Sequence, residues 1–386
     1  MNYIKNLLKD QKVEWKTLGE VCEIRTGQGI NKRMILDNAG EHPVINSGRE
    51  PLGFINKWNT EDDPIGITSR GAGVGSITWQ EGKYFRGNLN YSVTHDKNEI
   101  NTRFLYHLLL EFQREIQSLC TFDGIPALNT SNLKSLQIPI PPLAVQKEIA
   151  KILDTFTMLE AELEAELDCR KRQYQYYRDT LLTFGDNVEW KTLGEVCKIK
   201  GRIGFRGYTQ KDFVEKGEGA ISLSPGNMKN GYFDFEKCSY ISWEKYEESP
   251  EIKISEKDII FVKTGSTAGK VDVHFLPEKS TLNPQLVVLK DVECNKRFLF
   301  HLLNTNRYQA IIKTLINGAI PNISQKELSK LQIPLPPLEE QKRIVNILDK
   351  FDALVNDISQ GLPAEINARR KQYEYYREKL LSFPEN

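Results

Sequence analysis

The chain is built from two copies of one sequence unit, and this duplication constrains its fold more than any other feature. Three segments of the first half recur in the second half in the same order, the first of them letter for letter over ten residues. The matching pairs are 13–22 with 188–197, 101–109 with 295–303, and 136–143 with 331–338. Internal repetition on this scale predicts two equivalent structural units rather than one continuous domain.

The two copies differ mainly in one region. The offset between them is 175 residues at the first matching segment and 194 at the second, so the second copy is the longer one. Most of the added length corresponds to the stretch between Gly27 and Gly71, where the copies also cease to resemble each other. A common frame around two different inserts favours one scaffold that presents two different recognition surfaces. Divergence without functional constraint is the alternative interpretation.

A long helix is expected after each unit. From 143 to 184 the apolar residues recur at spacings of three and four, and these 42 residues would span about 63 Å as one helix. A second stripe runs from 344 to 383, and Gly361-Leu362-Pro363 predicts a kink or short break within it. Both stripes must be covered, so we expect an antiparallel helix pair with apolar surface left over for another protein's helices.

The repeat also includes the beginning of the chain. Segment 3–8 resembles 177–182, and a third version of this segment stands near the end of the chain at 376–381. The opening segment therefore corresponds to the helix end that precedes each unit. We expect a closed, pseudo-two-fold arrangement in which the N-terminus lies near the end of the last helix.

Each unit is expected to have an α+β fold. Short runs of β-forming residues such as 65–68 and 285–289 are broken by Gly, Asn and Asp. One amphipathic helix per unit is expected near 101–118 and 295–314. The Pro-x-Pro-Pro segment that ends each unit is interpreted as a rigid joint from strand to helix, in preference to a ligand for a proline-binding domain.

The composition limits the possible compartments and partners. Lys plus Arg equals Asp plus Glu at 52 each, so any nucleic-acid contact must come from local basic patches or be shared with a basic partner. The N-terminus has no long apolar stretch and nowhere do eighteen apolar residues run together, which predicts a cytoplasmic protein. None of the six cysteines forms a Cys-x-x-Cys pair, and the equivalent Cys22 and Cys197 are expected to be small buried residues.

The sequence contains no convincing catalytic motif. Both Pro-Pro pairs are preceded by Ile or Leu and followed by Leu, so neither forms the Asn/Asp-Pro-Pro-aromatic loop of an adenine methyltransferase. The segment 265–270 is one residue short of a phosphate-binding loop, and Val271 stands where Ser or Thr would bind magnesium. His107 and His301 occupy equivalent places, and the five histidines show no metal-ligand spacing. We expect neither catalytic residues nor a metal site in this chain.

The order of these motifs resembles that of the specificity subunits of Type I restriction-modification systems. Trp-Lys-Thr-Leu-Gly-Glu-Val opens each half, and Leu-Gln-Ile-Pro-x-Pro-Pro-Leu closes each β-rich part. Gln-Lys pairs follow, and Gln-Tyr-x-Tyr-Tyr-Arg tails end both helical segments. The resemblance covers essentially the whole chain. It implies two pseudo-two-fold-related target-recognition domains, of mixed β-sheet, loops and helices, separated by two long antiparallel coiled-coil helices.

The resemblance also implies a division of labour in phage defence. Each target-recognition domain would read one half of a split, asymmetric site in double-stranded DNA, and the helices would set the number of unread bases. Two methylation (M) subunits would dock on the helices and carry S-adenosylmethionine, while motor-nuclease (R) subunits would carry ATP and Mg²⁺. The expected segments are 1–12 (helical remnant), 13–142 (first target-recognition domain), 143–187 (central helix), 188–337 (second target-recognition domain) and 338–386 (C-terminal helix).

Candidate DNA contacts are basic and polar residues in the Gly-rich loops of the variable regions. Arg and Lys can bind phosphates or guanine edges, and Asn can bind adenine. In the first domain the candidates are Arg25, Lys32, Arg33, Arg70, Arg86 and Asn88. In the second domain they are Lys200, Arg202, Arg206, Lys263, Ser266 and Lys270. For each residue the alternative is an ordinary exposed side chain.

Two other classes of function stay open at this point. A self-contained methyltransferase or nuclease would bind S-adenosylmethionine or cleave DNA as the isolated chain. A purely architectural or anti-restriction scaffold would share the helices but lack sequence-selective DNA binding in its complex.

Overall fold

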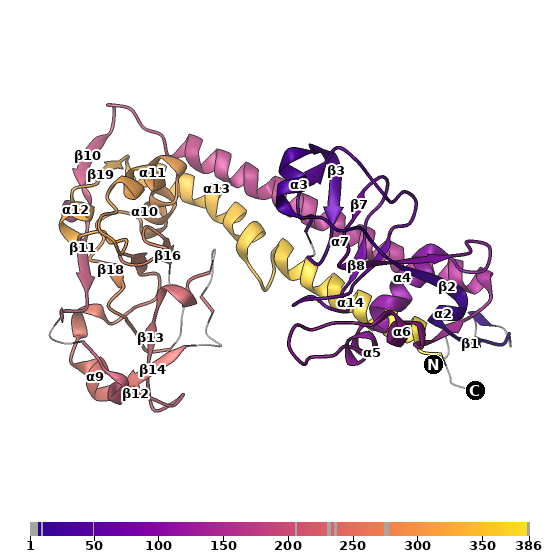
Figure 1. Cartoon of the computed structure of the whole chain (residues 1–386). Coiled ribbons are helices and arrows are strands. Elements are labelled where there is room, and N and C mark those ends of the chain that lie inside the picture. Colours follow the sequence, from indigo (N-terminus) through magenta and orange to yellow (C-terminus); the bar gives the residue numbers. More distant parts are fainter. Residues whose placement is uncertain are drawn as a thin grey trace. The chain divides into compact units, whose positions relative to one another are not determined.

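The computed structural model places most of the chain in two compact units (Figure 1). The structure describes residues 7–8, 11–48, 50–204, 207–229, 233–234, 238–273 and 278–383. The first unit comprises Met1–Ala161 and Ala368–Asn386, and the second comprises Glu162–Asn367. Each unit therefore combines one β-rich part with portions of both long helical segments.

In its described residues, the first unit contains three small β-sheets. An antiparallel ribbon β1-β9 pairs the Trp segment with the proline segment, a four-stranded sheet has the order β2-β8-β5-β6, and a three-stranded sheet has the order β4-β3-β7. In the last sheet β3 and β7 are parallel. The strands are β1 (Glu14–Thr17), β2 (Cys22–Thr26), β3 (Ala39–Ile45), β4 (Phe54–Ile55), β5 (Ile65–Thr68), β6 (Ile77–Trp79), β7 (Phe85–Arg86), β8 (Asn90–His95) and β9 (Gln137–Ile140).

The second unit repeats this plan with one addition. The ribbon β10-β19 and the sheet β11-β18-β15-β16 match their counterparts strand for strand, whereas the third sheet, β12-β14-β13-β17, has four strands instead of three. The strands are β10 (Glu189–Thr192), β11 (Lys198–Gly201), β12 (Phe213–Val214), β13 (Gly219–Leu223), β14 (Ser239–Ser242), β15 (Ile259–Val262), β16 (Val271–Val273), β17 (Ser280–Leu282), β18 (Leu286–Lys290) and β19 (Gln332–Leu335). The added strand lies in the region where the sequences diverge.

Two helices, not the single expected one, stand in each unit where the amphipathic pattern occurs. In the first unit α4 (Thr102–Glu111) and α5 (Gln113–Ser118) meet at Phe112, and in the second α10 (Lys296–Leu303) and α11 (Asn306–Thr314) are separated by two residues. Thr305 accepts a hydrogen bond from Tyr308 N and so starts a new helix, which the apolar spacing alone does not reveal. The shorter helices are α2 (Leu18–Val21), α3 (Lys32–Asp37), α6 (Thr130–Lys134), α8 (Leu193–Val196), α9 (Trp243–Glu247) and α12 (Gln325–Ser329).

The long helices form as the periodicity predicts. Helix α7 (Leu143–Leu181) is continuous over 39 residues and passes from the first unit into the second. The second stripe is divided into α13 (Leu338–Asn356) and α14 (Leu362–Leu381), so the predicted break is confirmed. A Cβ on Gly361 would lie 2.5 Å from the carbonyl oxygen of Ala353, which explains why glycine stands at this turn.

The helical segments run antiparallel within each unit, because contacts further along α7 fall on earlier residues of its partner. Glu160 pairs with Arg370 in the first unit, and Tyr174 bonds Asp352 in the second. In the first unit Phe156 of α7 stacks on Tyr376 of α14 at 5.2 Å. In the second unit Tyr177 of α7 stacks on Phe351 of α13 at 5.3 Å. Leu8 shares a buried core with Leu380 and Leu381, which confirms for residues 7–8 that the start of the chain lies near the end of the last helix.

The predicted division into five segments stays a prediction, because the compact units are divided within the helices rather than at the proposed boundaries. Segments 1–6 and 9–10 of the proposed remnant lie outside the described residues. In the part of the chain that the structure describes, no helix is long and apolar enough to cross a membrane.

Candidate nucleic-acid interface

A glycine turn of the same shape follows the central strand of the main sheet in both units. In the first unit Gly71 and Gly75 have φ angles of 97° and 77°, and in the second Gly265 and Gly269 have φ angles of 112° and 96°. Because side chains disfavour such angles, glycine is needed at all four positions. Each turn is closed by a 2.8 Å hydrogen bond from its second glycine to the end of the strand, at Thr68 O or Val262 O.

Each glycine turn is fastened to a second loop. Gly71 N donates to Pro126 O, and Gly265 N donates to Pro321 O, both at 2.9 Å. Residues 121–128 and 316–323 therefore form an equivalent surface with the turn in each unit. The phosphate-loop resemblance of 265–270 is thus explained by a turn that both units share.

Most sequence-predicted contact residues of the first unit lie at the surface. Arg25, Lys32, Arg33, Arg70 and Asn88 are all exposed. Lys32 and Arg33 stand in the first turn of α3, whose N-terminus is capped by Asn31. Arg33 keeps 92% of its side chain exposed, with only a 3.6 Å ion pair to Asp37, and Arg25 is paired with Glu23 at 2.7 Å.

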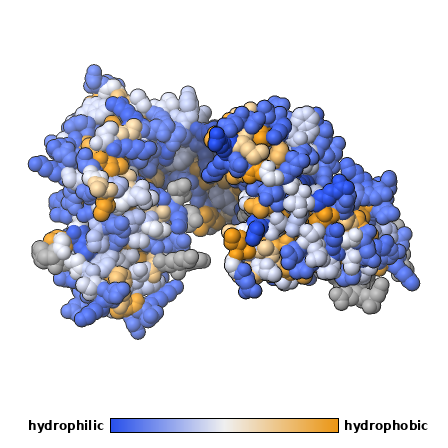
Figure 2. Space-filling view, in the orientation of Figure 1, coloured by the Kyte–Doolittle hydropathy of each residue, from blue (hydrophilic) through white to orange (hydrophobic). Residues whose placement is uncertain are grey.

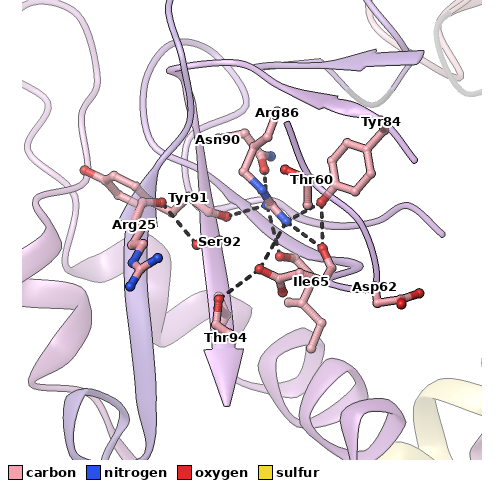
Figure 3. Close-up of polar contacts among 12 residues, drawn as sticks. Arg25, Thr60, Asp62, Ile65, Tyr84, Arg86, Asn90, Tyr91, Ser92 and Thr94 are labelled. Carbon is pink, nitrogen blue, oxygen red and sulfur yellow. Dashed lines mark hydrogen bonds and ion pairs between the residues drawn. The ribbon is translucent and has the colours of Figure 1, made fainter. Parts of the chain in front are cut away.

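Arg86 has a different environment (Figure 3). Its side chain is 3% exposed, and Nη1 donates to Ile65 O at 3.1 Å, Asn90 Oδ1 at 2.6 Å and Tyr91 O at 2.9 Å. Nη2 donates to Asp63 O at 2.7 Å and also contacts the hydroxyl of Tyr84. Burial raises the pKa of Tyr84. This guanidinium therefore ties β7 to β5 and β8 and supports the loops around it.

The candidate DNA contacts of the second unit also differ in how exposed they are. Lys263, Ser266 and Lys270 belong to the glycine turn, and Ser266 is exposed while Lys270 Nζ donates to Met228 O at 2.8 Å. Burial lowers the pKa of Lys270. Lys200 is half-buried on β11.

Arg202 parallels Arg86 in being buried, at 6% exposure. Its Nε donates to Leu282 O at 3.2 Å, its guanidinium lies 4.9 Å from the ring centre of Tyr208, and burial lowers its pKa. Arg206 lies outside the described residues.

An open cleft in the second unit contains cations that the sequence reasoning missed. It has a volume of about 840 Å³ and lies between the glycine turn, α10 and the end of α7. Lys171, Arg178 and Lys229 line it beside Lys270. The Gln-Tyr-x-Tyr-Tyr-Arg repeat contains Arg178, but only the fold brings that arginine to the turn. On the face drawn in Figure 2, hydrophilic side chains cover most of both units and apolar residues form small separate groups.

The equivalent histidines join the β-rich part to the helices within each unit. His107 of α4 lies 2.8 Å from both Tyr373 Oη and Asp154 Oδ1, and His301 of α10 lies 3.1 Å from Tyr174 Oη and 2.7 Å from Asp349 Oδ1. Burial lowers the pKa of both histidines. Because the carboxylate only accepts, each ring donates from Nε2 to its aspartate. Nδ1 of His107 then accepts from the Tyr373 hydroxyl, whereas the Tyr174 hydroxyl lies between Nδ1 of His301 and Asp352 Oδ1, which is 3.3 Å away. Both ring nitrogens of each histidine therefore have partners within the protein.

The equivalent cysteines lie in surroundings that disfavour their ionisation. Cys22 and Cys197 are buried as expected, and burial raises the pKa of each thiol to about 12. Thiols with such pKa values stay protonated and are poor nucleophiles. Across the described ranges, no group of three His, Cys, Asp or Glu residues is arranged to hold a metal ion.

Comparisons with known proteins agree with this architecture. The family model described as the Type I restriction modification DNA specificity domain matches residues 11–168 and 186–368. The chain therefore belongs to the family of Type I restriction-modification specificity subunits.

Individual relatives align over nearly the full length. The chain is 34% identical to a Type I restriction enzyme specificity subunit of Escherichia coli, with 100% of this chain and 98% of that protein aligned. It is 32% identical to a putative specificity subunit of Haemophilus influenzae, with 99% and 98% aligned. Among solved structures, the S subunit of a Type I system from M. genitalium has a TM-score of 0.62 at 18% identity, covering 97% of this chain and 98% of that one. That structure supports the fold.

Proposed function

We propose that this chain selects the DNA sequence for a Type I restriction-modification complex by reading two half-sites, one with each β-rich part. The observation that carries this proposal is the repetition of one scaffold around two different inserts. The main sheets have the same strand order and the same glycine turn, whereas the third sheets differ in strand number. Two β-rich parts that share a scaffold but differ in surface would suit a DNA site made of two different half-sequences. The recognition domains would span 13–142 and 188–337.

The exposed candidates are assigned to DNA contact and the buried arginines to support. Arg33 and Ser266 are exposed and can approach a duplex, where the Arg33 guanidinium can neutralise a phosphate and the Ser266 hydroxyl can donate a hydrogen bond to one. Arg86 and Arg202 have guanidinium groups committed to partners inside the protein, so their role is to position the loops that carry the readers. The other exposed residues assigned to DNA contact are Arg25, Lys32, Arg70 and Asn88, and the half-buried Lys200, Lys263 and Lys270 are assigned to it as well. Arg206 stays a proposed contact on sequence grounds.

The helices supply matched surfaces for partner subunits. Tyr176 and Tyr375 occupy equivalent places in the repeated Gln-Tyr-x-Tyr-Tyr-Arg segments and are 65% and 56% exposed. Exposed tyrosines at helix surfaces are typical of protein interfaces. One such surface per unit fits two methylation subunits, which would bring S-adenosylmethionine, while motor-nuclease subunits would bring ATP and Mg²⁺. On this proposal the chain has no catalytic step of its own and works in the cytoplasm.

Methylome sequencing of a host that expresses this chain with its methylation subunit tests the proposal. The expected result is a split motif of two short sequences around a gap of fixed length, with N6-methyladenine in both halves. A host expressing the methylation subunit alone is the matched control and should lack the motif. A single contiguous motif, or the same motif without this chain, would contradict the proposal. Methyl transfer or DNA cleavage by the isolated chain would favour a self-contained enzyme instead.

A further inference from the structure

Each unit exposes apolar side chains on a loop beside its glycine turn. We name these segments, 121–128 and 316–323, the apolar loops. Phe122 and Ile125 are each 64% exposed in the first, and Ile320 is 70% exposed in the second. Neither loop contains a lysine or arginine. Exposed apolar side chains that gather on one surface can mark a binding site.

The apolar loops are held in shape by their own hydrogen bonds. Thr121 and Ala127 exchange backbone hydrogen bonds of 2.8 and 3.0 Å, and Asn317 and Asn322 exchange two of 3.0 Å. Gly124 and Gly318 provide the positive φ angles, 93° and 89°, that these tight turns require. Ile125 and Ile320 therefore lie at the tips of loops whose shape is fixed by backbone hydrogen bonds.

The apolar loops belong to the proposed DNA-binding surface. Arg70 pairs with Ala127 through a backbone bridge, and Lys263 O accepts a 2.8 Å hydrogen bond from Ile323 N. A cation assigned to phosphate contact is thus bonded directly to each loop. A duplex that reaches the glycine turn would also meet the loop beside it.

The two loops keep the same apolar dipeptide although the recognition surfaces differ. Ile125-Pro126 in the first unit corresponds to Ile320-Pro321 in the second. A side chain that reads bases should differ between two unlike half-sites. A side chain that acts on what all duplexes share, the stacking of neighbouring base pairs, can be the same in both.

We propose that Ile125 and Ile320 act as wedges that enter the base stack of their half-sites and help to extrude the adenine that is methylated. Apolar side chains inserted between base steps unstack and kink DNA, and enzymes that modify a base must first take it out of the stack. The inference rests on the proposed function. In addition to selecting the sequence, this chain would help to unstack the adenine before it is methylated.

Methyl transfer to each half-site by the complex of this chain with its methylation subunits tests the wedge. Synthetic duplexes carry the motif found by methylome sequencing, with the adenine of one half already methylated so that only the other half reports. Ile125→Ala is expected to slow transfer about ten-fold at the half read by the first unit and to leave the other half unchanged. Ile320→Ala should show the reverse pattern, so each unit serves as the control for the other.

Removing the base opposite the target adenine provides the decisive comparison. An abasic site there abolishes the pairing that must be broken, so both variants should return to within about two-fold of the unaltered complex. Ile125→Leu, which keeps an apolar side chain, should stay close to the unaltered rate. Both isoleucines are largely exposed, so their truncation leaves the core intact.

Each other outcome overturns the wedge. Unchanged rates of methyl transfer in both alanine variants would show that the isoleucines do not help to unstack the duplex. A defect that persists at the abasic site, with weaker association of the methylation subunit in sedimentation, would show that the loops bind protein instead. If the unaltered complex methylates no split motif, the proposed function fails as a whole, whereas a normal motif with unaffected variants refutes the wedge alone.

Discussion

In each unit, the β-rich part is joined to the long helices by side chains that are the same in both copies of the repeat. His107 in the first unit and His301 in the second each lie between a carboxylate and a tyrosine hydroxyl. The tyrosines, Tyr373 and Tyr174, are buried at 8% and 5% exposure. Repetition of the same buried triad shows that the β-rich part is fixed on the helices in the same way in both units.

Removal of the Tyr373 hydroxyl should weaken the first unit. Tyr373→Phe keeps the ring but leaves Nδ1 of His107 without its donor, so the free energy of unfolding should fall by about 1 kcal/mol, more if that nitrogen finds no water. Urea denaturation followed by circular dichroism measures this change. Tyr375→Phe, at a side chain that is 56% exposed, is the control and should be nearly neutral. Equal effects of the two substitutions would contradict a structural role for the triad.

Asp272 predicts an unusual dependence of stability on pH. This carboxyl on β16 is 3% exposed, and burial raises its pKa from 3.8 to about 7. The folded state therefore holds the proton between these pH values while the unfolded state releases it, so the stability contribution falls as pH rises from about 4 to 7. Asp272→Asn removes the ionisation and should stabilise the protein at pH 8, by up to about 4 kcal/mol, with no gain below pH 4.

The control for Asp272 is a carboxylate at the surface. Asp168 keeps 67% of its side chain exposed, and Asp168→Asn should change stability by less than about 0.5 kcal/mol at either pH. Thermal unfolding at pH 4 and pH 8 separates the two cases. A loss of stability in Asp272→Asn at pH 8 would show that the charged carboxylate has a partner worth more than its burial costs.

At the residue scale, the sequence shows which side chains are basic or polar but not what surrounds them. Arg33 and Arg86 look alike in the sequence, yet one is exposed and the other is buried among partners from 63 to 91. Those partners come together only when β5, β7 and β8 assemble. In the same way the cations of the second-unit cleft, such as Lys171 and Lys229, are distant in the chain and meet only in the fold.

At the element scale, the spacing of apolar residues and the positions of glycine and proline determined which helices and strands could be predicted. Helix α7 and the break before α14 follow from apolar spacing and from Gly361-Leu362-Pro363, and the strands at 65–68 and 286–290 follow from β-forming runs. The third sheets could not be predicted, because their parallel pairs, β3 with β7 and β13 with β17, join short segments far apart in the chain. No local pattern encodes such pairing.

The turn between α13 and α14 should be intolerant of any side chain at Gly361. A Cβ there would lie 2.5, 2.7 and 2.8 Å from the carbonyl oxygens of Ala353, Asp357 and Leu354, all of them backbone atoms that must shift. Gly361→Ala should therefore lower the free energy of unfolding by about 1–3 kcal/mol. Gly29→Ala, where nothing lies within 4 Å of the new Cβ, is the matched control in chemical denaturation. A neutral Gly361→Ala would show that the turn relaxes freely.

The helices should set the gap between half-sites. Seven residues inserted after Ala161 in α7, with seven after Asn367 in α14, add about 10 Å of helix and keep both apolar stripes nearly in phase. Since base pairs are about 3.4 Å apart, the unread gap should grow by roughly three base pairs while both half-motifs stay the same. Methylome sequencing reads the gap directly. A lengthened chain that still methylates the original motif would contradict a spacing role for the helices.

At the scale of the whole molecule, the two recognition parts are organised as separate modules. Each compact unit contains its own core, its own glycine turn and its own contacts to both helical segments. The duplication was visible in the sequence because the shared frame keeps the same residues. The surfaces that read DNA were not predictable, because the inserts have no common pattern and their side chains are arranged by long-range packing.

Replacement of residues 188–337 by a second copy of 13–142 tests this modularity most directly, because identical frames flank both segments. Methylome sequencing of a host that carries the altered chain with its methylation subunit should reveal a palindromic motif, in which the half read by the first unit appears twice in inverted orientation. Retention of the original asymmetric motif would contradict the assignment of one half-site to each recognition domain.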